Sequence, residues 1–64
     1  MLEYRLYLLD RSGHICHGED FVSESDDSAM TYGRAKSAGQ PAEVWQYARV
    51  VGKIPGYRSA KAQA

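Results

Sequence analysis

The segment that most constrains the fold is an alternating run near the start of the chain that leads directly into a turn. In an extended strand, side chains point alternately to the two faces. One face of the run is apolar throughout and consists of Leu2, Tyr4, Leu6 and Leu8. The other face mixes polar and apolar side chains and consists of Glu3, Arg5, Tyr7 and Leu9. The run therefore predicts a β-strand that buries one face.

A turn signal follows at residues 10–13. Asp10 can accept hydrogen bonds from the backbone that follows it, and Gly13 can adopt the positive φ that closes a type I turn with a bulge. We expect residues 14–17 to form the return strand of a β-hairpin. The next residues are expected to lead out of the sheet, with Phe21 and Val22 plugging the core at its end.

Helix-start signals gather in residues 23–27, which provide serines for the N-cap and two aspartates for the first turn, where the helix dipole favours acids. Gly39 is a natural C′ residue, and Pro41 prevents continuation. The helix between them, ending near Ala38, has a thin apolar face. Gly33 in its middle is expected to cost up to ~1 kcal/mol relative to alanine.

Residues 43–54 are rich in β-branched and aromatic side chains and predict a second hairpin. Its turn, at residues 47–49, lacks the glycine or asparagine of a tight loop, so one long strand over residues 44–51 is the alternative. Trp45, the only tryptophan, is expected to contribute most to the core. The chain is therefore predicted to be α+β, in the order β-β-α-β-β, with an antiparallel sheet and one helix on one face. This domain is expected to span residues 1–54, and residues 55–64 are expected to be a disordered tail.

A chain of 64 residues buries only about 60% of its unfolded surface and needs additional stabilisation. A single cysteine forms no disulfide within the chain, which leaves oligomerisation as the common means. One helix covers one face of a sheet, so Tyr7 and Leu9 are expected to lack cover within the chain. We therefore expect a homodimer with Tyr7 and Leu9 in its interface.

The spacing of His14, Cys16 and His17 is the one pattern that suggests a metal site. In an extended strand at most two of these side chains share a face, and zinc needs four ligands. Half-buried strand residues are therefore the expected interpretation, with no metal and no cofactor. The chain has no nucleophile motif and no glycine-rich phosphate loop, so we expect no enzymatic activity and no catalytic residues.

Basic residues in the second half of the chain suggest an alternative function, the binding of nucleic acid by a regulatory protein. The candidate contacts are Arg49, Lys53, Arg58 and Lys61. A formal net charge of zero makes nucleic acid the less favoured partner. The sequence contains no apolar window long enough for a membrane helix and no secretory signal, and its lone thiol fits a cytoplasmic location. The main expectation is a small protein-interaction module whose protein partner is unknown.

Several short patterns together resemble a group of short alphaproteobacterial proteins of unknown function. They are Tyr4-Arg5-Leu6-Tyr7, the turn from Leu9-Asp10 through Gly13-His14-Ile15, Asp20-Phe21, Asp26-Asp27 with Ala29, and Glu43-Val44-Trp45 with Arg49-Val50-Val51. The likeness covers roughly residues 3–54. It implies the same fold pattern and a bacterial cytoplasmic setting, and it implies no activity. The chain departs from the group at Gly33 and in the turn of the second hairpin.

Overall fold

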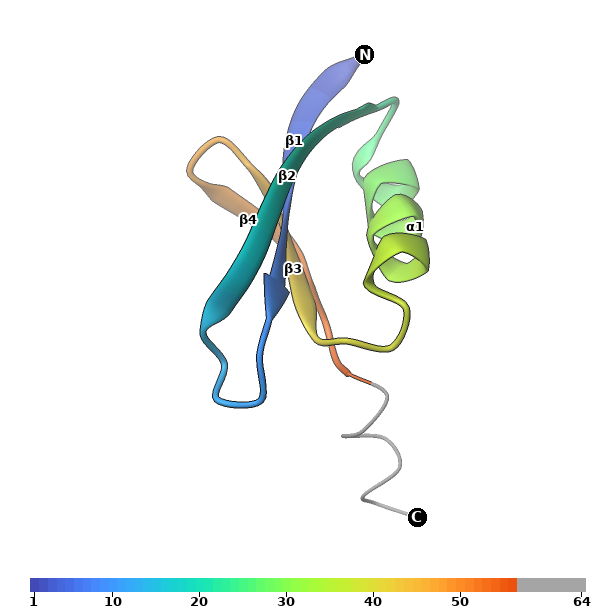
Figure 1. Ribbon diagram of the computed structural model, residues 1–64. Coiled ribbons are helices and arrows are strands. Elements are labelled where there is room, and N and C mark those ends of the chain that lie inside the picture. Colours follow the sequence, from blue (N-terminus) through green and yellow to red (C-terminus); the bar gives the residue numbers. More distant parts are fainter. Residues whose placement is uncertain (57–64) are drawn as a thin grey trace.

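The computed structural model describes residues 1–56, which form four strands and one helix (Figure 1). The elements are β1 (Leu2–Leu9), β2 (Ile15–Ser23), α1 (Asp26–Ser37), β3 (Ala42–Gln46) and β4 (Arg49–Ile54). The strands form one antiparallel sheet in the order β2-β1-β3-β4, with α1 on one side of it. The predicted α+β class and β-β-α-β-β order are confirmed. Most of the expected tail, residues 57–64, lies outside the described residues.

The first hairpin has the turn that its sequence predicts. Gly13 has a positive φ of 87°. One carboxylate oxygen of Asp10 accepts hydrogen bonds from the backbone N–H groups of Ser12 and His14, both at 2.9 Å. Asp10 therefore fixes the turn from within, as short acidic side chains do. Past the turn, the pairing of β1 with β2 skips Cys16, which makes a bulge at the start of β2.

The second strand is longer than expected. The prediction that the chain leaves the sheet after residue 17 is wrong, because β2 continues to Ser23. Gly18 does not interrupt it, since the Tyr7 ring of β1 lies over this position, 3.3 Å from where a Cβ would stand. The Tyr7 ring thus packs on the backbone of Gly18, where no side chain is present.

Only one of the two residues expected to plug the core does so. Phe21 is half-buried and stacks between Tyr4 and Tyr32, with ring centroids 5.6 Å and 4.2 Å away. Val22 points to the other side of β2 and is 56% exposed. The alternation of a strand separates these neighbours, so the expectation for Val22 is wrong.

The core lies between α1 and the sheet. Its buried hydrophobic members are Tyr4, Leu6, Ala29, Ala42, Val44 and Ile54. Leu6 of β1 and Val44 of β3 are opposite each other and fully buried. Gly33 lies directly over them, because a Cβ there would come within 2.9 Å of Val44 Cγ2. Because Gly33 has no side chain, the helix can approach the sheet closely. The packing gained in this way offsets the low helix propensity of glycine.

The helix begins as predicted and ends differently. Ser25 is the N-cap, and its hydroxyl accepts a hydrogen bond from the Ser28 N–H at 3.2 Å. At the other end, Ala38 is already in the left-handed region, with φ 51° and ψ 47°, one residue before the expected Gly39. Gly39 also has a positive φ, of 90°. The chain thus places an alanine where glycine is the usual residue.

The second hairpin is confirmed, and the single long strand is excluded. A two-residue turn at positions 47 and 48 connects β3 to β4. Tyr47 has a φ of 55°, and Val51 is skipped in the pairing, as a bulge in β4. Packing continues past the expected boundary at Ile54, because Gly56 is buried against Pro41.

Candidate functional site

The candidate site is the face of the sheet that α1 does not cover, which we call the open face. Its side chains come from all four strands: Arg5 and Tyr7 of β1, Asp20 and Val22 of β2, Glu43 and Trp45 of β3, and Val50 and Lys53 of β4. Strand alternation assigns them to this face, because their neighbours Leu6 and Val44 point into the core. The pairing registers then determine which of these side chains meet.

Two aromatic rings occupy the centre of the open face. Tyr7 and Trp45 meet edge to face, with centroids 6.2 Å apart and planes at 85°. The Trp45 indole N–H donates to a carboxylate oxygen of Glu43 at 3.0 Å. The expectation that Trp45 contributes most to the core is therefore wrong. Val44 points toward α1, so its neighbour Trp45 must point away, and it remains half-exposed.

Beside the rings is an ion pair between neighbouring strands. Arg5 contacts one carboxylate oxygen of Asp20 through two of its nitrogens, both at 2.8 Å. The Asp20 carboxylate raises the pKa of Arg5. The Arg5 guanidinium also lies over the Tyr7 ring, 5.8 Å from its centroid. The site thus holds its arginine between a ring and a carboxylate, an arrangement that combines cation–π attraction with a charge-assisted hydrogen bond.

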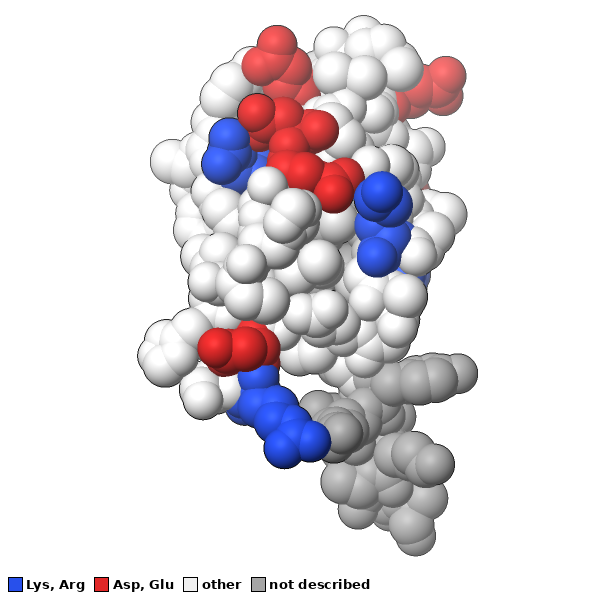
Figure 2. Space-filling view, viewed as in Figure 1, with Lys and Arg blue, Asp and Glu red and all other residues white. Residues whose placement is uncertain are grey.

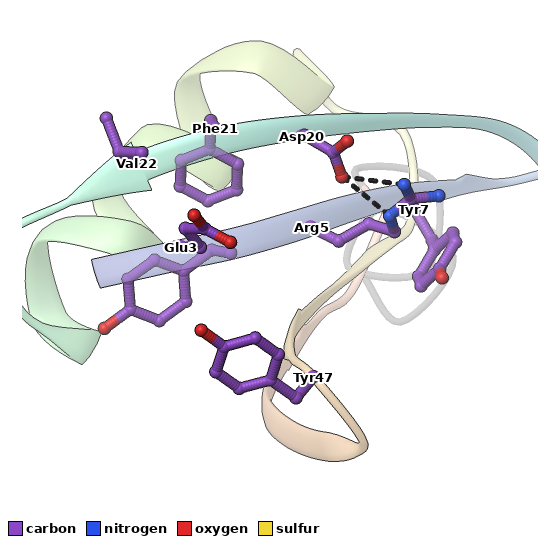
Figure 3. A pocket seen from close by; sticks show the side chains of 8 residues that line it. Glu3, Arg5, Tyr7, Asp20, Phe21, Val22 and Tyr47 are labelled. Carbon is purple, nitrogen blue, oxygen red and sulfur yellow. Dashed lines mark hydrogen bonds and ion pairs between the residues drawn. The ribbon is translucent and has the colours of Figure 1, made fainter. Parts of the chain in front are cut away.

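A hollow of about 550 Å³ opens at one end of this face (Figure 3). It is lined by Glu3, Tyr4, Arg5, Tyr7, Asp20, Phe21, Val22 and Tyr47. It exists because β3 pairs with β1 only along residues 5–8, so residues 2–4 of β1 have no strand beside them on that side. The turn that joins β3 to β4 stands off from β1 here, and Tyr47 on that turn extends over the space.

A second network holds this turn in place. Arg49, just after the turn, donates to the Asp26 carboxylate at 3.3 Å and also bonds the Gln46 side chain. Tyr4 donates to the same carboxylate at 2.9 Å. The hydrogen bonds from Arg49 and then Tyr4 lower the pKa of Asp26. Asp26, at the start of α1, therefore connects Arg49 of the second hairpin to Tyr4 of β1. This connection holds the turn that carries Tyr47.

The two residues predicted for a dimer interface lie in different surroundings. Tyr7 is at the centre of the open face and is half-buried by its neighbours there. Leu9 lies at the end of β1, where its N–H donates to the Pro41 carbonyl at 2.9 Å and its carbonyl accepts from the Gln40 side chain at 3.0 Å. The loop before β3 thus partly covers Leu9, so Tyr7 is the better candidate for a contact.

The basic residues expected to contact nucleic acid do not form one surface among the described residues. Arg49 is engaged by Asp26, and Lys53 is opposite Glu43 on the neighbouring strand. Acidic side chains lie between the basic ones in the view of Figure 2. Arg58 and Lys61 lie outside the described residues.

The two histidines and the cysteine at or just before the start of β2 also do not converge, and all three are exposed, so the expectation that they are half-buried is wrong. His14 lies 4.0 Å from Asp10 and His17 lies 3.7 Å from Glu19, while Cys16 is next to the Gln40 amide. Residues 1–56 contain no group of three side chains that could hold a metal ion.

Within the same residues, no helix has the length and apolar character needed to cross a membrane. Comparison with family models, with curated proteins and with solved structures finds no match to this chain. The resemblance to short alphaproteobacterial proteins therefore stays a prediction.

Sequence reasoning missed most of the open face. Trp45 was assigned to the core, and no role in a protein interface was predicted for Glu3, Arg5, Asp20 or Tyr47. The alternation that identified Tyr7 also placed Glu3 and Arg5 on the same face, so this signal was present in the sequence. No signal predicted that Tyr47 would extend over β1, because that depends on where β3 stops pairing.

Proposed function

We propose that this chain is a small, non-catalytic protein-interaction module that binds a second copy of itself through the open face. The observation that carries the proposal is the Tyr7–Trp45 pair at the centre of that face, which α1 leaves uncovered. Aromatic side chains at the centre, with charged ones around them, are typical of protein interfaces. The setting implied by the resemblance is a bacterial cytoplasm.

The charges of the open face favour a second copy as the partner. A twofold interface brings the same surface of both subunits together, so that surface must be compatible with itself. The open face carries both signs, with Arg5 and Lys53 among Asp20 and Glu43. Such a surface meets its own copy without a strong repulsion between like charges. Association would also stabilise a chain of only 64 residues.

The test is the mass in solution by light scattering, for the natural chain and for Trp45→Asp. We expect a dimer for the natural chain and a monomer for the variant, because the new carboxylate would be buried without a partner in the interface. Trp45 lies outside the core, so the variant should keep its fold, as far-UV circular dichroism would show.

The matched control is Ala35→Asp, which adds the same charge on an exposed position of α1. It should remain a dimer. A natural chain that is monomeric at high protein concentration, or a Trp45→Asp variant that remains dimeric, would contradict the proposal.

Nucleic-acid binding is the second candidate, and one observation favours it. Tyr7, Trp45 and Arg5 are aromatic and cationic groups on an open sheet face, the kind of surface on which single-stranded bases stack. Against it, Asp20 already pairs with Arg5. Quenching of Trp45 fluorescence by single-stranded oligonucleotides, weakening steeply with salt, would favour this candidate over the first.

A further inference from the structure

The hollow on the open face contains a ring and a carboxylate placed like those that hold Arg5 beside it, but no arginine between them. Arg5 is held between the Tyr7 ring and the Asp20 carboxylate. Tyr47 and Glu3 provide a second ring and a second carboxylate that line the same hollow (Figure 3). Within residues 1–56, no cation forms an ion pair or hydrogen bond with Glu3. Tyr47 and Glu3 thus provide the ring and the carboxylate of an arginine site, and the arginine is missing.

The conformation of Tyr47 supports a role outside the chain. Its φ of 55° is one that favours glycine, and the residue is 80% exposed. An aromatic side chain in such a conformation gains little from its own chain that would offset the strain. Strained, exposed residues of this kind cluster at binding sites, where a ligand provides the missing contacts.

We propose that the hollow is a socket for an arginine side chain, and that this arginine is Arg11 of the second copy. The inference rests on the proposed dimer through the open face. The socket lining carries two carboxylates, of Glu3 and Asp20, and one guanidinium, of Arg5, so its formal charge favours a cation. A planar guanidinium can stack on Tyr47 and bond both oxygens of Glu3, which a lysine ammonium matches less well.

The topology favours Arg11 over other basic residues. Arg11 is exposed on the turn between β1 and β2, whereas Tyr47 is on the turn between β3 and β4, at the opposite end of the sheet (Figure 1). If two open faces pack about a twofold axis perpendicular to the strands, the strands of the two copies run in opposite directions and the lateral strand order is kept. The first turn of each copy then lies against the far ends of β1 and β2 of the other, where Glu3 and Val22 line the hollow. Each Arg11 then meets the socket of its partner, and the contact occurs twice.

The size of the open face also calls for contacts at its ends. Strands about 4.8 Å apart and about 3.3 Å long per residue give the four strands a face of about 440 Å². A specific interface of standard size buries about 800 Å² per partner. Two arginine sockets, one at each end, would extend the interface toward that size and determine the relative orientation of the copies.

The test is an exchange of charges between the two positions. Glu3→Arg and Arg11→Glu should each weaken the dimer about tenfold or more, because like charges then meet at both ends. The double variant, Glu3→Arg with Arg11→Glu, should restore the dissociation constant measured by sedimentation, because the pair is re-formed with its partners exchanged. Both positions are exposed, so the fold should survive in all three variants.

Tyr47→Gly removes the ring and relieves the strained φ. It should raise the melting temperature measured at a protein concentration low enough for the chain to be monomeric. It should nevertheless weaken the dimer. The matched control is Ala38→Gly, which relieves the positive φ of another non-glycine residue, on the helix side of the sheet, and should raise the melting temperature without changing the dimer.

The outcomes separate this inference from the proposed function. Single charge variants that dimerise like the natural chain, or a double variant no tighter than the singles, would overturn the socket. If Trp45→Asp still abolished the dimer in that case, the open-face dimer would stand without it. A natural chain that is monomeric would overturn both.

Discussion

Replacing Gly33 by alanine should destabilise this protein, although the same change stabilises most helices. Gly33 is in the middle of α1, where alanine is favoured by about 1 kcal/mol. Here, however, the new Cβ would be 2.9 Å from Val44 Cγ2 and 3.0 Å from Ile54 Cδ1. The Ile54 atom is the end of a flexible side chain and can move, whereas Val44 is β-branched and fully buried.

The magnitude follows from the difference of these two effects. Inserting a methyl group into a packed core costs about 1–3 kcal/mol. Taking about 2 kcal/mol for this cost and subtracting the gain in helix propensity leaves a net loss of about 1 kcal/mol for Gly33→Ala. For a domain of this size, such a loss lowers the melting temperature by about 4–8 °C.

The assay is urea unfolding followed by circular dichroism, with two further variants. Ala35→Gly, at an exposed position of the same helix, measures the propensity difference without a change in packing and should cost about 1 kcal/mol. In a Val44→Ala background the clashing methyl group is gone. There Gly33→Ala should stabilise by about 1 kcal/mol, the amount that propensity alone provides. A Gly33→Ala protein more stable than the natural chain would refute the reasoning.

Three further changes should alter stability in defined directions. Ala38→Gly should stabilise by about 1 kcal/mol in thermal unfolding, because Ala38 has a left-handed φ of 51°, and unchanged stability would contradict this. Asp10→Ala should cost about 1 kcal/mol in urea unfolding, since two turn amides lose their acceptor; a value near zero would show that the turn does not depend on them. Asp26 has a lowered pKa in the folded state, so its contribution is present above the unfolded pKa of about 4 and is lost as the pH falls through the folded value. Asp26→Asn should therefore make the free energy of unfolding depend less on pH below about 4. An unchanged pH dependence in this range would contradict the prediction.

Local patterns predicted the elements well where one residue type determines the backbone. The alternation of residues 2–9, the turn closed by Gly13, and the acidic start of α1 all specify structure within a few residues, and the structure confirms them. The second hairpin was also predicted, although its turn carries Tyr47 in a glycine-like conformation.

The errors arise where the outcome depends on distant parts of the chain. Val44 and Trp45 are both apolar, so alternation alone could not show which of them faces the helix. The chain was expected to leave the sheet at Gly18, but the ring of Tyr7 covers this glycine. That ring comes from the neighbouring strand, so no pattern local to Gly18 shows that the strand continues. The hollow likewise depends on where β3 separates from β1, which no local pattern encodes.

The strand order has a consequence for how the sheet assembles. Each hairpin closes through a short turn, whereas β1 pairs with β3 across a separation of 38 positions, from Leu6 to Val44. Loop closure over that distance costs about 2 kcal/mol more than over four residues. We therefore expect the two hairpins to form early and to join late, and a β1–β3 contact already formed in the folding transition state, by φ-value analysis, would contradict this. Until they join, β1 is an edge strand with its core face bare, although in the finished sheet it lies between β2 and β3.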